Sequence, residues 1–250
     1  MTGMLASVQT LDEAQIVLKN GADIIDLKAP ASGALGALPV DQVYPIVDAI
    51  RHTLPVSATI GDIPMEPQIV HNAVMTMAAT RVDFVKIGFF SEGDKNATLD
   101  RLKNTSLSNT RLIAVLFADG HLELSDIAKA SNAGFSGVML DTQDKSHGRL
   151  TNLLTGEQLK QFVNEARRHQ LLCGLAGSLN IQDISTLLPL APDYLGFRGA
   201  LCKNHIRIED IDPDAVSRVK NAIHTEILPD HPISPMTSGR PITANSASSR

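Results

Sequence analysis

The sequence predicts a closed (β/α)8 barrel, a TIM barrel, as a single α/β domain over residues 1–228. Short apolar runs alternate with amphipathic runs eight times in succession, and this alternation favours a parallel sheet with crossover helices. The eight units span about 230 residues, close to the ~250 typical of such a barrel. An open doubly wound sheet is the competing architecture. It is disfavoured because no Gly-x-Gly-x-x-Gly loop follows the first apolar run.

The individual elements are predicted from apolar runs and from the residues that begin and end helices. The expected strands are the apolar runs Met4–Val8, Asp23–Lys28, Val56–Ile60, Phe84–Phe90, Arg111–Phe117, Gly137–Leu140, Leu171–Ala176 and Tyr194–Phe197. The expected helices are Leu11–Asn20, Val40–Leu54, Pro67–Ala79, Asn96–Leu107, Leu124–Ala133, Gly156–His169, Ile181–Leu188 and Pro213–Ile227. Thr10 and Thr155 are expected N-caps, and Gly21 is an expected helix stop. Residues 229–250, rich in Pro, Ser and Thr, are expected to form a flexible tail.

Composition limits the classes of function. A net charge of −5 argues against a nucleic-acid partner bound through phosphate neutralisation. No run has the length of a membrane span, and the N-terminus carries no secretory signal pattern. Two distant cysteines, Cys173 and Cys202, form neither a disulfide framework nor a zinc motif. We therefore expect a cytoplasmic protein without a membrane or nucleic-acid partner.

The stretch Asp23–Ala37 contains the first sign of chemistry. It begins as an apolar strand, but Asp26 and Lys28 interrupt it before a loop rich in Gly, Ala and Ser. Residues two apart on a strand point to the same face, so these two charges lie together at the strand's carboxyl end. Burying both costs several kcal/mol each unless they are paired or used. A plain ion pair that closes the strand is one interpretation, and a catalytic pair is the other.

Further polar residues occupy the carboxyl ends of other expected strands, where the active site of such a barrel is built. They are Ser57, Thr59 and Asp62 at the third strand, Lys86 at the fourth, Asp141 and Lys145 at the sixth, and Arg198 at the eighth. The amino ends of the strands offer nothing comparable. Three lysines and three aspartates that converge on one mouth are hard to explain as independent ion pairs, so the cluster indicates a functional site.

Glycine-rich segments end the last two strands. Gly177 and Ser178 precede a short helix, and Gly199 follows Arg198. Phosphate sites in these barrels are frequently built there from backbone N–H groups. Tight strand exits would need the same glycines, but Ser178 and Arg198 favour a site for a phosphorylated small molecule.

Lysines inside an apolar barrel also have a chemical interpretation. Desolvation and neighbouring ammonium groups lower the pKa of an amine and make it nucleophilic toward carbonyls. Lys28 and Lys86 could influence each other in this way, one forming a Schiff base and the other moving protons, with Asp26 and Asp141 assisting. This chemistry requires neither a metal nor another cofactor, and the scattered histidines suggest no metal cluster.

Six segments, in the same order, resemble the (5-formylfuran-3-yl)methyl phosphate synthase family. They are Asp23–Ala37, Val56–Asp62, Val85–Gly88, Met139–Thr142, Leu175–Leu179 and Gly196–Ala200. The resemblance runs from about Met4 to about Ile227. It implies a TIM-barrel lyase that condenses two molecules of glyceraldehyde 3-phosphate, with loss of one phosphate and of water, for the synthesis of methanofuran-type coenzymes.

The same resemblance implies roles for individual residues. Lys28 would form the Schiff base and Lys86 would accept the proton, with Asp26, Asp141 and Lys145 in support. A class I aldolase for a sugar phosphate is the enzymatic alternative, and a non-catalytic sugar-phosphate-binding barrel is an alternative of another class. A homo-oligomer is expected.

Overall fold

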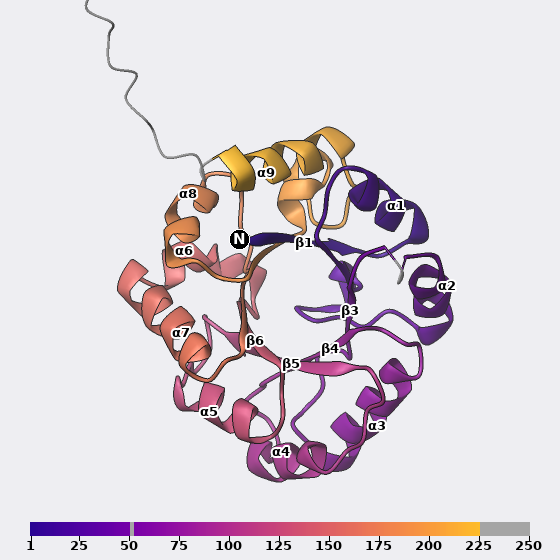
Figure 1. The fold of residues 1–250 in the computed structure, drawn as a ribbon, viewed down its shortest axis with the longest axis vertical. Helices are drawn as coiled ribbons and strands as arrows, with labels where there is room; N and C mark the ends of the chain where they lie inside the picture. The colour runs from indigo at the N-terminus through magenta and orange to yellow at the C-terminus, as the bar shows by residue number, and fades with distance from the viewer. Residues whose placement is uncertain (51–52, 226–250) are drawn as a thin grey trace, which may run out of the picture.

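Eight parallel strands pair in chain order, and β1 also pairs with β8, so the sheet closes into a barrel (Figure 1). The structure, a computed structural model, describes residues 1–50 and 53–225. The strands are β1 (Gly3–Val8), β2 (Ile24–Leu27), β3 (Val56–Thr59), β4 (Phe84–Gly88), β5 (Arg111–Phe117), β6 (Gly137–Asp141), β7 (Leu172–Leu175) and β8 (Tyr194–Phe197). The predicted closed barrel is therefore confirmed.

Helices surround the barrel on its outer side (Figure 1). They are α1 (Leu11–Lys19), α2 (Val40–Ile50), α3 (Pro67–Ala78), α4 (Lys95–Lys103), α5 (Ser125–Asn132), α6 (Leu150–Leu153), α7 (Gly156–Arg168), α8 (Asp183–Leu187) and α9 (Pro213–Thr225). Short 3-10 turns add η1 (Pro30–Ser32), η2 (Lys145–His147), η3 (Leu188–Leu190), η4 (Gly199–Leu201) and η5 (Lys203–His205).

Most predicted boundaries agree with the structure to within a few residues. The sequence did not predict η2 and α6, which lie in the loop after β6 and are too short to carry an amphipathic pattern. Thr155 caps α7 as predicted, in a capping box with Gln158. The predicted flexible tail, 229–250, lies outside the described residues and stays a prediction.

Two apolar layers explain the strand pattern. The larger lies between the barrel wall and the helices, and the smaller fills the barrel interior. The interior layer includes Leu5, Phe84, Ile113, Met139 and Tyr194, from five different strands. Because both faces of each strand are covered, the strands are nearly continuous apolar runs rather than alternating ones.

Three aspartates at the amino ends of strands correct the expectation that these ends carry nothing comparable. Asp23, Asp83 and Asp193 each precede an even-numbered strand and accept a hydrogen bond from a backbone N–H of the strand before it, at 2.7–2.8 Å. Lys220 of α9 also contacts Asp23 at 2.7 Å. These carboxylates satisfy backbone donors that the ladder leaves open, so they stabilise the barrel rather than form a site.

None of the helices within 1–50 and 53–225 is long and apolar enough to cross a membrane.

We expect Gly174→Ala to destabilise the protein. A Cβ at Gly174 would lie 2.3 Å from the ring of Tyr194 inside the barrel. Overpacking of this kind costs about 1–3 kcal/mol. The matched control is Gly156→Ala at the start of α7, where an added Cβ meets nothing within 4 Å. Urea unfolding midpoints measure both variants, and equal midpoints would contradict the tight interior packing.

Candidate active site

A cavity of about 600 Å³ opens at the carboxyl ends of the strands. Its lining includes Lys28 after β2, Asp141 at the end of β6, Gly177 after β7 and Arg198 after β8. This volume is within the range of small-molecule sites. Six basic and two acidic side chains line it, so its lining is positive although the whole chain is negative. The cavity therefore suits a small anionic ligand.

Asp26 and Lys86 form a buried ion pair in the cavity wall. The Nζ of Lys86 lies 2.6 Å from Oδ1 of Asp26, and both side chains are at most 1% exposed. Ser57 donates to the same oxygen at 2.7 Å, and Ser7 donates to the other oxygen at 2.9 Å. The carboxylate thus has three partners from β1, β3 and β4. Burial alone would raise the pKa of Asp26, but the charges of Lys86 and Lys28 and these hydrogen bonds lower it.

Lys28 has a pKa well below the ordinary value of a lysine. Its side chain is 6% exposed, and its Nζ lies 3.9 Å from Oδ2 of Asp141. Burial lowers the pKa of Lys28 to about 8, with Lys145 and Lys86 adding to the effect and Asp141 opposing it. Roughly a tenth of this amine is therefore uncharged at pH 7, far more than for an ordinary lysine, and only the uncharged form attacks a carbonyl.

Asp141 joins two of the lysines. Lys145 lies 2.6 Å from its Oδ1, and the Thr142 backbone N–H donates to the same oxygen at 2.7 Å. Burial alone would raise the pKa of Asp141, but Lys145 and Lys28 lower it to about 2. Lys145 also donates to the backbone carbonyl and to the hydroxyl of Thr142. Asp141 is hence a carboxylate that orients two amines at once.

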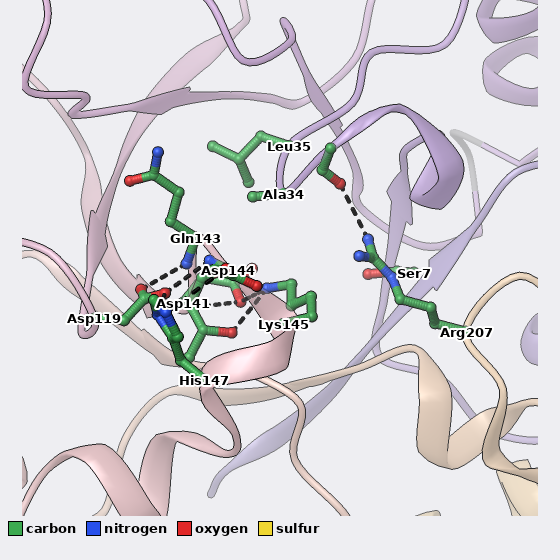
Figure 2. A network of polar contacts seen from close by, with 12 residues as sticks. Ser7, Ala34, Leu35, Asp119, Asp141, Gln143, Asp144, Lys145, His147 and Arg207 are labelled. Atoms are coloured by element: carbon green, nitrogen blue, oxygen red, sulfur yellow. Dashed lines mark hydrogen bonds and ion pairs between the residues drawn. The ribbon is translucent and has the colours of Figure 1, made fainter.

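Asp119, in the loop after β5, fixes the segment that carries Lys145 (Figure 2). Its two carboxylate oxygens accept from the backbone N–H groups of Gln143 and Asp144 at 2.6 and 2.7 Å. The ring of His147 contacts the same carboxylate at 3.2 Å. The position of Lys145, after β6, therefore depends on a carboxylate that follows the neighbouring strand β5.

The structure brings together the five residues predicted to be catalytic: Asp26, Lys28, Lys86, Asp141 and Lys145 all line the cavity. Of the residues predicted to bind phosphate, Gly177, Ser178, Arg198 and Gly199 line it as well. The described lining does not include Ser57, Thr59 and Asp62.

Those last three residues have protein partners. Ser57 donates to Asp26, and Thr59 donates to the carbonyl of Gly36 at 3.0 Å. Asp62 accepts from the backbone N–H groups of Ala34 and Leu35 at 2.8 and 2.7 Å. Thr59 and Asp62 thus hold the loop after β2, and any direct contact with a ligand stays a prediction.

Three residues at or around the site were not found by sequence reasoning. Ser7 is a small residue in a strand, Asp119 lies in a loop after an otherwise apolar strand, and Arg207 follows an irregular segment. Ser7 could have been found, because it is the one polar residue in the apolar run Met4–Val8 and lies near its carboxyl end. Nothing in the local pattern separates Asp119 or Arg207 from ordinary surface charges. Within the described ranges, no group of three or more His, Cys, Asp and Glu side chains is arranged to hold a metal ion.

We expect the reactivity of Lys28 to titrate near pH 8. Labelling by an amine-reactive reagent should rise with pH and reach half of its maximum near pH 8, because only the neutral amine reacts. The exposed Lys160 on α7 is mapped in the same samples as an internal standard for the reagent. Asp141→Asn removes a charge that raises the pKa, so the midpoint should move lower. Peptide mapping measures each site, and a labelling midpoint of Lys28 well above pH 8 would contradict the burial argument.

We expect Asp119→Asn to loosen the segment after β6. An amide has one acceptor oxygen where the carboxylate has two, so one backbone donor loses its partner. A hydrogen bond to a charged group contributes about 1.5–3 kcal/mol, so amide exchange at Gln143 and Asp144 should accelerate by about 10- to 100-fold. Asp41→Asn on the outer face of α2 is the control. Unchanged exchange at both amides would show that the segment is held by other contacts.

Comparison of the fold with solved structures gives TIM barrels. Phosphoribosyl anthranilate isomerase from Thermotoga maritima aligns with a TM-score of 0.65 at 13% identity, covering 90% of this chain and 100% of that chain. At this identity the similarity establishes the fold alone.

Sequence comparison is more specific. A candidate (5-formylfuran-3-yl)methyl phosphate synthase of Methylorubrum extorquens is 41% identical over 220 residues, 88% of this chain and 91% of the relative. The (5-formylfuran-3-yl)methyl phosphate synthase of Methanopyrus kandleri is 34% identical over 211 residues, 80% of this chain and 89% of the relative. The sequence model of 4-HFC-P synthase matches residues 4–220. This chain therefore belongs to the 4-HFC-P synthase family.

Proposed function

We propose that the protein synthesises (5-formylfuran-3-yl)methyl phosphate from two molecules of glyceraldehyde 3-phosphate, in the biosynthesis of a methanofuran-type coenzyme. In this proposal it is a carbon–oxygen lyase that works through an imine on Lys28. Membership of the family supports the product, and the site supports the route. The cytoplasmic location and self-association expected from the sequence stay predictions.

The observation that carries the mechanism is the state of Lys28. It is a buried amine with a pKa lowered to about 8, and it faces a positive cavity of about 600 Å³. Its nitrogen attacks the aldehyde carbon of the first triose phosphate, and the carbonyl oxygen leaves as water. Asp141, 3.9 Å from this nitrogen, is placed to stabilise the protonated imine that forms.

Lys86 and Asp26 serve proton transfer in this scheme. The imine acidifies the neighbouring carbon, and the loss of a proton there gives an enamine whose carbon attacks the carbonyl of a second molecule. Lys86 and Asp26 lie 2.6 Å apart and can pass a proton between them. Ser7 and Ser57 hold the carboxylate on its other sides, so its orientation does not change as the proton moves.

Elimination of phosphate then requires stabilisation of a leaving anion. Lys145 is 20% exposed at the cavity, and the backbone at Gly177 and Ser178 also lines it. Fixed cations and N–H groups in a partly enclosed site stabilise developing negative charge more than water does. The overall negative charge of the chain does not oppose this, because the lining is positive.

The test is incubation with glyceraldehyde 3-phosphate alone, followed by mass identification of the product and a phosphate assay. The expected result is a furan phosphate and free phosphate. A linear sugar phosphate without release of phosphate would instead indicate a class I aldolase. Binding without any product would indicate a non-catalytic sugar-phosphate barrel.

We expect Lys28→Met to abolish both turnover and trapping of the substrate by borohydride, because in the proposed route Lys28 supplies the nitrogen of the reducible imine. Lys160→Met on the outer helix α7 is the matched control and should behave as wild type. Mass spectrometry of the reduced protein locates the adduct. Retention of the adduct in the Lys28 variant would remove Lys28 from the mechanism.

A further inference from the structure

Arg198 and Arg207 both border the cavity, but their guanidinium groups differ in what they contact. All five N–H groups of Arg198 donate to protein oxygens. They contact the Glu13 carboxylate at 2.6 and 3.1 Å, and the carbonyls of Ser7, Arg207 and Glu209 at 3.2, 2.8 and 3.0 Å. A phosphate could bind the Arg198 side chain only by displacing one of these partners.

Arg207 has most of its donors open. Within the described part of the chain, its side chain makes one hydrogen bond, from Nη2 to the carbonyl of Gly33 at 3.1 Å. Arg207 is half-buried, and Figure 2 shows its guanidinium to one side of Lys145, with the loop of Ala34 and Leu35 above both. Four of its five donors therefore remain for a ligand in the cavity.

The backbone around Arg207 is held firmly. Its carbonyl accepts from Nε of Arg198, and the carbonyl of Glu209 accepts from another nitrogen of the same guanidinium. Just before it, Asn204 and His205 both have left-handed backbone conformations, with φ of 54° and 57°. Non-glycine residues adopt this conformation at a cost, which persists where surrounding contacts enforce it. Arg198 is in this way a positioning residue for the loop that carries Arg207.

We infer that Arg207, rather than Arg198, binds the phosphate group of a triose phosphate at the mouth of the cavity, keeping its hydrogen bond to Gly33. This inference rests on the proposed function, since it identifies a substrate-binding residue of that site. The ligand chemistry is a phosphate monoester, which a planar guanidinium binds through two parallel N–H groups.

The charges around Arg207 favour an anion there. Asp141 and Asp62 attract the guanidinium and Arg198 repels it, while burial lowers its pKa from the ordinary value. Asp141 is already neutralised by Lys145 and Lys28, and Asp62 already accepts two backbone hydrogen bonds. Since arginine keeps its charge at neutral pH, a half-buried guanidinium with open donors is stabilised by a phosphate.

The first experiment measures binding without chemistry. Glycerol 3-phosphate carries the phosphate but no carbonyl, so its affinity does not depend on imine formation. Arg207→Met should weaken its binding by about 10- to 100-fold in isothermal titration calorimetry. The matched control is Arg168→Met on α7, an arginine whose side chain is 72% exposed and pairs with Glu165, and it should not change the affinity. Unchanged affinity in the Arg207 variant overturns the inference.

The second experiment separates phosphate recognition from a general structural effect. Borohydride trapping is measured with glyceraldehyde 3-phosphate and with glyceraldehyde, which lacks the phosphate. The Arg207 variant should lose trapping efficiency with the phosphorylated aldehyde and keep it with the other. An equal loss with both aldehydes indicates damage to the fold and overturns the inference.

A third variant protects the test against loss of folding. Arg207→Lys keeps the charge but not the planar fork, and its affinity for glycerol 3-phosphate should lie between those of the wild type and the Met variant. Wild-type affinity would contradict bidentate binding. Failure of the proposed function is distinguishable, because in that case no furan forms although glycerol 3-phosphate binding still depends on Arg207.

Discussion

The buried contact between Asp26 and Lys86 is the constraint on which the site depends. Two charges from neighbouring parts of the barrel wall are removed from water, which is tolerable only because each has a partner and the carboxylate also accepts from two hydroxyls. The removal of one partner would leave an unpaired buried charge, at a cost of about 3–5 kcal/mol. The two members of the pair act in opposite directions on the pKa of Lys28, because Lys86 lowers it and Asp26 raises it.

The sequence predicted the barrel and the convergence of the five charged residues because both follow from periodicity. Once eight strands alternate with helices, every carboxyl end lies at one mouth, and Asp26, Lys28, Lys86, Asp141 and Lys145 follow from their place in the strands. The partners of those residues could not be predicted in the same way. Ser7 contacts Asp26 across 19 residues of chain, and Asp119 holds backbone groups 24 and 25 residues away.

Arg198 shows why the partner of a charged residue cannot be predicted from the neighbouring sequence. Arg198 follows a strand and a glycine-rich exit, so its position favours a phosphate ligand, yet its partner Glu13 lies 185 residues earlier in the chain. Likewise, aspartates at the amino ends, such as Asp83, look unremarkable in sequence because their partner is a backbone N–H group. In each case the decisive contact is long-range and involves a group that carries no sequence signature.

Some residues of the site are anchored by barrel strands and others by loop segments, and the loop segments tolerate changes of sequence more easily. Lys28 and Lys86 are anchored at β2 and β4, whose relative register is set by the ladder of the closed barrel. Lys145 and Arg207 lie in segments outside the strands. Hydrogen bonds between the backbone and the side chains of Asp119 and Arg198 hold these segments in place. Insertions and exchanges in those segments can therefore alter which molecules enter without moving the reacting nitrogen. The strands thus fix the reacting lysines, while the loops that contact the substrate can vary. This separation allows new substrates to evolve around an unchanged chemistry.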